Sequence, residues 1–356
     1  MQRRLVFVSR YRGFLGALVV LIHAGITYGA AGAWYYVQPA GDPWLRTLAS
    51  FLSFAARSFV PGAFFFLSGY FVPGSLEHRG TWGLLRERCM RLLIPLAVYA
   101  LVANPLLVRV VAFRGSGGSV RSGLIFGPGP AWFLAALFVF LLVFLGARWA
   151  FPGRPAATAR GIPSQPRILM SIVVFAFLSF LLRSLFPADD GISRLPMYAI
   201  LFAAGIKAGT EQWLEDIASL PIGAWSVLAG GGLLLFPVLG MGGSFSLGDI
   251  SFGGLHWQSA ARELWSAATG MALFIVTLIL FSRARWVIPG TGESFSSSSY
   301  AIFLLHPPIV VLLALAMRDV PLSPAVAWLT LSLAGTCVPW GLAAALKKAA
   351  GLSRVF

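Results

Sequence analysis

Residues 10–24 read RYRGFLGALVVLIHA, a stretch in which an apolar run follows directly on arginines. An apolar helix of about 20 residues is long enough to cross a hydrocarbon core about 30 Å thick. No small-residue cleavage site follows a short apolar core here, as it would in a secretory signal peptide. We therefore expect this segment to be a retained first transmembrane helix that begins near Gly13.

Comparable apolar runs recur along all 356 residues, which are 58% hydrophobic and only 11% charged. Soluble domains contain about 25% charged residues, so this composition and the mean hydropathy of +0.82 exclude that class. Strands of a membrane barrel would alternate apolar and polar residues over about ten positions, and the chain has no such alternation. The sequence predicts an all-α, polytopic membrane helix bundle of about ten transmembrane helices, in a single domain that covers residues 1–356.

Ten spans can be drawn from the apolar runs. They are 13–37, 47–73, 92–112, 131–150, 168–186, 195–210, 222–241, 259–281, 298–317 and 323–346. Proline removes a backbone donor and obstructs the preceding turn, so we expect the second span to break at Pro61. The sixth span is short and contains Pro196.

The net charge of +15 comes from basic residues between the spans, and no nucleic-acid-reading motif accompanies it. With the N-terminus in the cytoplasm, 18 of the 27 Lys and Arg residues fall on the cytoplasmic side, eight fall on the outer side, and Arg57 lies inside a span. Cytoplasmic loops carry an excess of Lys and Arg. We therefore expect both termini in the cytoplasm, together with a flexible loop at about 151–167.

The first span carries two ionisable residues, Arg12 and His23, which are eleven positions apart. Eleven helical residues rise about 16 Å and turn about 20° past three full turns, so both side chains share one face. This spacing puts a cation at the cytoplasmic mouth and an imidazole near mid-membrane on one wall of a cavity. Neutral imidazole suits proton abstraction from a hydroxyl. The alternative is a histidine bonded to a neighbouring helix and an arginine that only follows the positive-inside rule.

A second basic cluster precedes the third span, and within it Arg88 and Arg91 are three residues apart. Side chains with this spacing are neighbours on a helix surface. Two guanidiniums there can clamp the phosphates of a nucleotide-containing donor, whereas the alternative is membrane anchoring by positive charge. The chain has no His, Cys or carboxylate spacing typical of a metal site, so no metal and no permanently bound cofactor are expected.

Polar residues at membrane depth are functional candidates because their burial in lipid is costly. Arg57 needs a partner or a water-filled cavity. Glu263 is a candidate partner for a buried cation, although pairing with Arg262 is the alternative. His306 precedes two consecutive prolines, which are expected to break the helix nearby, and its ring would then bond the carbonyls that they free. The small pair at Ser68 and its following glycine is expected to permit close helix approach.

Five segments, taken in order, resemble the acyltransferase 3 family of integral-membrane acyltransferases. They are the Arg-x10-His of Arg12 and His23, FFFLSGY at 64–70, Arg88 and Arg91 ahead of LLIP, PAWFL at 130–134 and SYAIFLLHPP at 299–308. The resemblance implies a bundle of about ten helices, an acyl-CoA co-substrate that enters from the cytoplasm, and an acceptor on the far side that is commonly a carbohydrate.

Carried onto this sequence, the resemblance implies that His23 is the catalytic base and that Arg12 is its helper at the donor. It also implies that Arg88 and Arg91 bind the donor. Six further residues are candidates for the cavity wall. They are Arg57, Ser68, Trp132, Glu263, Tyr300 and His306.

We expect an integral-membrane O-acyltransferase that moves an acetyl or other short acyl group from cytoplasmic acyl-CoA to a hydroxyl of a carbohydrate or glycolipid. The expected partners are acyl-CoA, this carbohydrate or lipid-linked acceptor and the lipids of the cell's cytoplasmic (inner) membrane. Nucleic acid is not expected, and a homo-oligomer is left open. His23 would act as a general base or be acylated itself, and the sequence leaves both routes open. The alternative function is a transporter or lipid flippase that uses the same polar cavity without chemistry.

Overall fold

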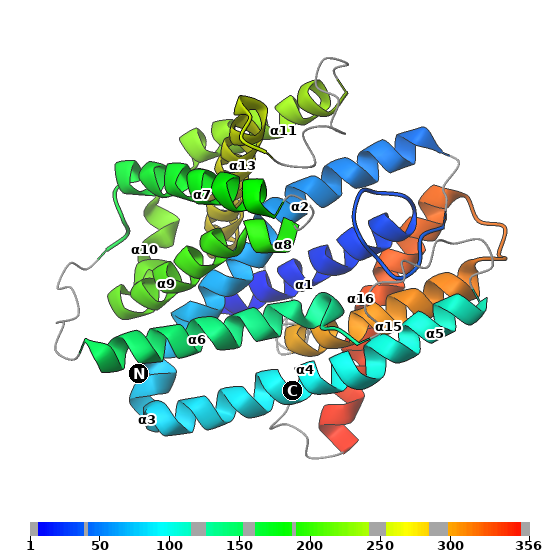
Figure 1. Ribbon diagram of the computed structural model, residues 1–356, viewed down its shortest axis with the longest axis horizontal. Coiled ribbons are helices and arrows are strands. Elements are labelled where there is room, and N and C mark those ends of the chain that lie inside the picture. Colours follow the sequence, from blue (N-terminus) through cyan, green and yellow to red (C-terminus); the bar gives the residue numbers. More distant parts are fainter. Residues whose placement is uncertain are drawn as a thin grey trace. The chain divides into compact units, whose positions relative to one another are not determined.

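The computed structural model describes seven stretches of the chain, and every regular element within them is a helix (Figure 1). The described residues are 6–38, 42–114, 126–151, 161–186, 190–241, 254–284 and 298–349. Residues 152–160, which make up most of the expected cytoplasmic loop, lie outside them.

The long helices follow the apolar runs of the sequence, and short helical turns join some of them. In chain order the elements are α1 (Val6–Thr27), α2 (Pro43–Tyr70), α3 (Val72–Arg88), the π-helical η1 (Cys89–Leu93), α4 (Ile94–Val98), the π-helical η2 (Tyr99–Ala103), α5 (Asn104–Arg114), η3 (Gly129–Ala131), α6 (Trp132–Ala150), α7 (Gln165–Leu185), α8 (Asp190–Ser193), α9 (Leu195–Glu211), α10 (Trp213–Asp216), η4 (Ile217–Ser219), α11 (Ile222–Met241), α13 (Trp257–Arg283), α15 (Ser299–Met317) and α16 (Pro324–Ala349).

Within the described residues, eight helical stretches are long and apolar enough to cross a membrane. A ninth is counted if the bent pair Trp213–Ser219 and Ile222–Phe236, with 86° between its parts, forms one span. Helix α9 coincides with the expected sixth span but has only 17 residues, which is at the lower limit for a crossing. The all-α, polytopic membrane bundle is confirmed, and the expected number of ten spans is approximate.

The first helix ends ten residues earlier than expected, at Thr27 rather than near residue 37. The amide of Ala30 bonds the Gly25 carbonyl at 3.0 Å and that of Gly29 bonds the Ile26 carbonyl at 3.1 Å. These two bonds form a Schellman motif, in which the residue after the cap takes a left-handed conformation that glycine adopts without strain. Gly29 has a φ of 101°, so backbone geometry ends the helix although the following residues are still apolar.

Neither helix break expected at a proline occurs. Helix α2 continues through Pro61, and α15 continues through Pro307 and Pro308. A proline at position i leaves the carbonyl at i−4 without its donor, and other groups can satisfy that carbonyl inside a membrane. For Pro61 this carbonyl belongs to Arg57, and it accepts a bond of 3.1 Å from the guanidinium of Arg194.

The described helices belong to two compact units, and the first comprises Met1–Ala56, Thr81–Leu145 and Arg285–Phe356. In this unit α1 packs against α15 and α16, and α5 packs against α15 (Figure 1). Close packing is possible where glycines face side chains. A Cβ added at Gly335 of α16 would meet Val20 of α1 at 2.9 Å. Helices α1, α15 and α16 thus pack against one another in the first unit.

The second unit comprises Arg57–Gly80 and Gly146–Ala284, and in it α13 packs against both α7 and α11. Here α9 approaches the second half of α2 so closely that backbones touch. A Cβ added at Gly69 would collide with the carbonyl of Phe202, and one at Gly205 would collide with that of Phe66. The close helix approach expected after Ser68 is confirmed, and it is of the small-residue type found between membrane helices.

Candidate active site

Two histidines from different helices of the first unit meet at the packing contact of α1 and α15. The Nε2 atom of His306 lies 3.1 Å from the Nδ1 atom of His23, and the ring centroids are 5.0 Å apart. The His306 side chain is 0% exposed, whereas His23 is part-buried. His23 lies in the last turn of α1, near the end opposite Arg12. The expected depth of His23, about 16 Å beyond Arg12 along the helix, stays a prediction.

The tautomers of both rings follow from the groups that surround His306. Its Nδ1 atom lies 2.7 Å from the carbonyl oxygen of Phe303 and 3.2 Å from that of Ile302. A carbonyl can only accept, so this nitrogen carries the proton. In the neutral ring the Nε2 atom of His306 is then an acceptor, and the Nδ1 atom of His23 must donate to it. The remaining nitrogen of neutral His23, Nε2, is therefore the basic one.

Pro307 explains why His306 has this orientation. The proline has no N–H for the carbonyl of Phe303 four residues earlier, and the Nδ1–H group of His306 supplies the missing donor at 2.7 Å. The expectation that His306 bonds a carbonyl freed by the prolines is confirmed. The ring nevertheless has a second contact, because its other nitrogen holds His23. One nitrogen of His306 thus has the expected structural contact, and the other contacts the candidate base.

The arginines predicted to bind a donor gather at the other end of α1. Arg88 and Arg91 both act electrostatically on Arg12, and both act on the hydroxyl of Tyr300. That hydroxyl donates to the backbone carbonyl of Arg91. Glu87 lies 3.1 Å from Arg91, at the i,i+4 spacing, and neutralises part of the positive charge. Helix α1 therefore joins the cationic cluster to the histidine pair, and α15 does the same through Tyr300 and His306.

Arg88 and Arg91 were expected on one regular α-helix, and the structure places them in two different helical segments. Arg88 is the last residue of α3, whereas Arg91 lies inside the π-helical segment η1. A π-helical turn rotates successive side chains differently from an α-helical one, and such segments are frequent at functional sites. The π-helical turn therefore lies between Arg88 and the position that Arg91 takes in the cluster.

A third ring comes from the loop after α1. The indole of Trp34 stacks on His23, with ring centroids 4.1 Å apart and 21° between the planes. The next residue, Tyr35, binds the hydroxyl of Tyr99 at 3.0 Å and donates to the side-chain oxygen of Asn104. Burial raises the pKa of Tyr35, so its phenol remains protonated and able to donate. Tyr35 thus ties the loop that carries Trp34 to η2 and α5.

Comparison with known protein families identifies the chain's family. A family model described as an acyltransferase domain, that of acyltransferase 3, matches residues 7–344, which is nearly the whole chain. The chain belongs to the acyltransferase 3 family. No curated protein and no solved structure matches it significantly. The protein is therefore a membrane acyltransferase, as the ordered segments of its sequence predicted.

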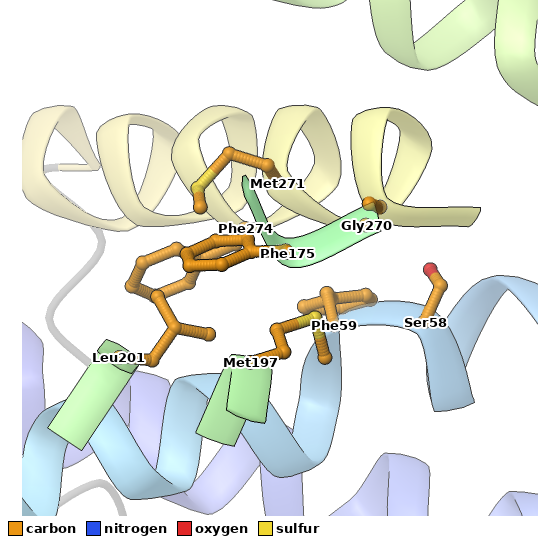
Figure 2. Close-up of a pocket in the computed structure, with 9 residues that line it drawn as sticks. Ser58, Phe59, Phe175, Met197, Leu201, Gly270, Met271 and Phe274 are labelled. Carbon is orange, nitrogen blue, oxygen red and sulfur yellow. The ribbon is translucent and has the colours of Figure 1, made fainter. Parts of the chain in front are cut away.

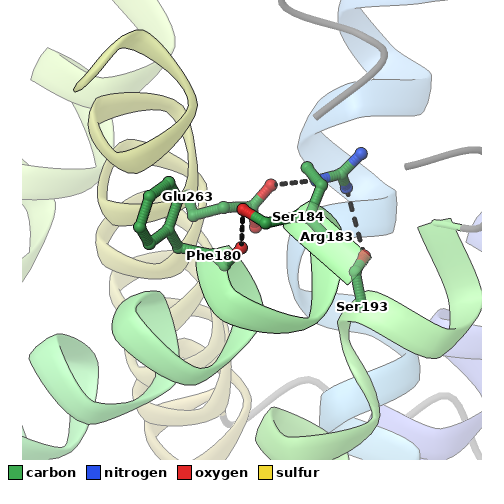
Figure 3. Close-up of polar contacts among 5 residues, drawn as sticks. All are labelled: Phe180, Arg183, Ser184, Ser193 and Glu263. Atoms are coloured by element: carbon green, nitrogen blue, oxygen red, sulfur yellow. Dashed lines mark hydrogen bonds and ion pairs between the residues drawn. The ribbon is translucent and has the colours of Figure 1, made fainter. Parts of the chain in front are cut away.

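Three candidate residues of the acyltransferase lie in the second unit. Glu263 of α13 pairs with Arg183 of α7 at 2.5 Å, and their side chains are only 4% and 1% exposed (Figure 3). Arg183 also donates to Ser193 at 3.2 Å. This pairing replaces the Arg262 partner considered from the sequence. Arg57 contributes its backbone carbonyl to Arg194, and Ser68 is part-buried on α2.

Trp132 opens α6 in the first unit, where it contacts the next aromatic ring of the same helix. Its centroid lies 6.3 Å from that of Phe133, and Phe133 lies 5.5 Å from Phe303. Phe303 is the residue whose carbonyl holds His306. The PAWFL segment is thus connected to the histidine pair through two aromatic rings, and no polar contact of Trp132 enters this connection.

Sequence reasoning missed Trp34, Tyr35, Tyr99 and Asn104. The loop was assigned to an apolar span, although glycines after a periodic run are a signal for a helix end. Asn104 is a polar residue within an apolar stretch, which is itself a functional signal in a membrane protein. Among the described residues, no three His, Cys, Asp or Glu side chains come together in a way that could hold a metal.

The second unit contains an apolar pocket where α2, α7, α9 and α13 meet (Figure 2). Phe59, Phe175, Leu201 and Phe274 contribute to its wall, and Ser58 brings the one hydroxyl of the lining. No ionisable group lines it. The lining of this pocket therefore suits apolar groups and offers no side chain for proton transfer.

Proposed function

We propose that this acyltransferase moves an acetyl or other short acyl group from a cytoplasmic acyl-CoA to a hydroxyl of a carbohydrate or glycolipid, with His23 as the general base. The observation that carries the proposal is the bond between Nδ1 of His23 and Nε2 of His306. It leaves the Nε2 atom of His23 as the basic nitrogen, and a base oriented by a second group is the arrangement that acyl transfer requires.

In the reaction, the acceptor hydroxyl gives its proton to Nε2 of His23 as its oxygen attacks the thioester carbonyl carbon. The carbonyl π pair moves onto oxygen and returns when the carbon–sulfur bond breaks. The proton on His23 then passes to the sulfur, so that free coenzyme A and the acyl ester leave. During this cycle the Nδ1–H group of His23 keeps its bond to His306, and the ring returns to its starting tautomer.

The cationic cluster at the other end of α1 supports the choice of donor. Coenzyme A carries its phosphates and its thiol at opposite ends of a long pantetheine arm. Arg12 and His23 are separated by about 16 Å along the helix, so phosphates beside Arg12 and a thioester beside His23 fit one extended molecule. Charge-assisted bonds from guanidinium groups to phosphate are among the strongest hydrogen bonds in proteins. Arg88 and Arg91 would provide them.

The position of His23 supports an acceptor that enters from the far side. His23 lies one turn before the end of α1 at Thr27, and the excess of basic residues favours the cytoplasmic side for the start of this helix. The donor would then come from the cytoplasmic end and the acceptor hydroxyl from the outer end. A carbohydrate or a lipid-linked sugar has hydroxyl groups that can reach such a site.

The test uses purified protein in lipid vesicles with radiolabelled acetyl-CoA and an extract of the host's own glycolipids and polysaccharides. The wild-type protein should release free coenzyme A in proportion to labelled ester. His23→Gln should reduce turnover about 100- to 10,000-fold, the usual contribution of a positioned base, while acetyl-CoA still binds. Coenzyme A release without acceptor, in a single burst, would favour an acylated His23. An intact thioester in every condition would refute the proposal.

A further inference from the structure

We infer that Trp34 is a further catalytic residue, whose indole N–H donates a hydrogen bond to the thioester carbonyl oxygen of the donor. The inference rests on the proposed function, because it concerns the same acyl transfer at His23. When the acceptor oxygen attacks, negative charge develops on that carbonyl oxygen. A donor already fixed in the site stabilises this charge without reorganisation, and such donors usually make the largest single contribution to catalysis.

The first observation is that the Trp34 indole nitrogen is buried and has no hydrogen-bond partner. Buried indole N–H groups normally find one, since an unsatisfied donor costs free energy. Three other tryptophans follow this rule. Trp213 donates to Glu211 at 2.7 Å, Trp265 to the Gly232 carbonyl at 2.8 Å, and Trp328 to the Leu21 carbonyl at 3.5 Å. Trp225 of the second unit shares this property with Trp34, but it does not belong to the unit that contains His23.

The second observation is where this donor lies. The ring of Trp34 is nearly parallel to His23 at 4.1 Å and to His306 at 6.3 Å, with 8° between the latter planes. Ring nitrogens act in the ring plane, so in a parallel stack the indole N–H and the basic nitrogen of His23 do not point at each other. Each therefore points outward in the plane of its own ring, so a donor and a base lie side by side in one stack.

The third observation concerns the other donors around His23. The Thr27 hydroxyl donates to the backbone carbonyl of His23 at 3.0 Å, and Nδ1–H of His306 is held by Phe303. The backbone of Arg12 is about 16 Å away along α1, and its guanidinium belongs to the cationic cluster with Arg88 and Arg91. Among these groups of the described residues, the indole N–H of Trp34 is the one without a partner in the protein.

The fourth observation is that Trp34 is held in place, as a catalytic donor must be. The loop closes back on α1 through the amide of Gln38, which bonds the Thr27 carbonyl at 2.7 Å. The ring of Tyr35 meets the indole edge-on at 5.3 Å. Gly129 packs against the Tyr35 hydroxyl, and a Cβ there would approach it to 2.5 Å. The backbone of Gly129 also has a φ of 43°. A larger residue would therefore both clash with the Tyr35 hydroxyl and strain the backbone.

The rival role for Trp34 is stacking alone, which would need the ring but not its N–H group. Replacing Trp34 by 3-benzothienylalanine, introduced at a reassigned stop codon, separates the two roles. This residue has the shape of tryptophan and carries sulfur in place of N–H. Trp34→Phe serves as a second variant that also removes the donor. Trp44→Phe is the matched control, because Trp44 is 83% exposed.

The assay measures kcat and KM for acetyl-CoA in vesicles with the host glycolipid extract, together with equilibrium binding of acetyl-CoA. If Trp34 donates to the oxyanion, the benzothienyl variant should lose about 100- to 1,000-fold in kcat and keep its acetyl-CoA affinity. The control should match the wild type. A benzothienyl variant with wild-type kcat would overturn the inference while leaving His23 as the base. Absence of turnover in the wild type, by contrast, would overturn the proposed function and this inference with it.

Discussion

His306 offers the most direct test of the histidine pair, because one ring has two contacts with different consequences. Its Nε2 atom accepts from His23 at 3.1 Å, and its Nδ1–H group satisfies the Phe303 carbonyl at 2.7 Å. Replacing His306 by Leu removes both bonds. The first loss should lower activity and the second should lower stability, so the two contributions can be measured separately.

The activity change can be worked out from the lost bond to His23. A neutral hydrogen bond contributes about 0.5–1.5 kcal/mol, and each 1.36 kcal/mol corresponds to a factor of ten in rate. Loss of the tautomer preference alone should thus reduce kcat about 2- to 13-fold. If the ring of His23 also turns away, the loss should approach the roughly 10,000-fold effect of a wrong tautomer in serine-protease triads. His306→Gln keeps an acceptor oxygen and should be the milder change.

The stability change comes from the Phe303 carbonyl, which Pro307 leaves without a backbone donor. An unsatisfied buried acceptor costs about 1–3 kcal/mol, so His306→Leu should unfold at a lower temperature in detergent. His306→Asn can still donate to this carbonyl from a shorter side chain, and it should recover part of the stability without recovering activity. The assay is acetyl-CoA turnover in vesicles, with acetyl-CoA binding as the control for folding. Wild-type kcat in a well-folded His306→Leu protein would refute the assigned tautomers.

Three further predictions follow from charges. Arg88→Gln with Arg91→Gln should raise the KM for acetyl-CoA and leave the acceptor KM unchanged, since each charged bond contributes about 1.5–3 kcal/mol. Glu263→Gln should lower the free energy of unfolding by about 3–5 kcal/mol, because it leaves the buried charge of Arg183 uncompensated; thermal unfolding in detergent measures this. A reporter fused after Phe356 should be active in the cytoplasm, as the distribution of basic residues requires.

Each of these predictions has a result that contradicts it. Equal losses for donor and acceptor in the double arginine variant, with poor membrane insertion, would indicate that these arginines only anchor the helix. Exchanging both members of the buried pair for Leu removes both charges and should be far milder than Glu263→Gln, as in other proteins where a buried ion pair was replaced by apolar residues. Equal destabilisation by both changes would show that charge is not the cause. A reporter active only outside the cytoplasm would reverse the topology.

The helices could be predicted because their signal is local. The expected spans 168–186 and 298–317 agree with α7 (Gln165–Leu185) and α15 (Ser299–Met317) within a few residues. Hydropathy does not register backbone conformation, however, so the end of α1 was placed at residue 37. The signal that decides it is Gly29, whose φ of 101° closes the Schellman motif. Because of the same error, the residues around Trp34 were assigned to a helix and not recognised as a loop.

The candidate site could be predicted only where one helix carries it. Helical periodicity places Arg12 and His23 on one face of α1, and that inference needs no knowledge of other helices. His23 and His306 are 283 residues apart in the sequence, so their contact depends on how α1 packs against α15. The partner of Glu263 was missed for the same reason, since Arg183 lies 80 residues away.

The prolines are involved in both kinds of error, those in the course of the helices and those in the partners of side chains. A proline inside a membrane helix was interpreted as a break, because the carbonyl four residues earlier loses its donor. In both units a side chain supplies the donor instead, from Arg194 to the carbonyl of Arg57 and from His306 to that of Phe303. In a soluble helix water can satisfy such a carbonyl, whereas in lipid a protein group must do so. Pro307 thereby fixes which nitrogen of His306 carries the proton, and through it which nitrogen of His23 is basic. A residue that donates no hydrogen bond thus determines the protonation pattern of the proposed catalytic base.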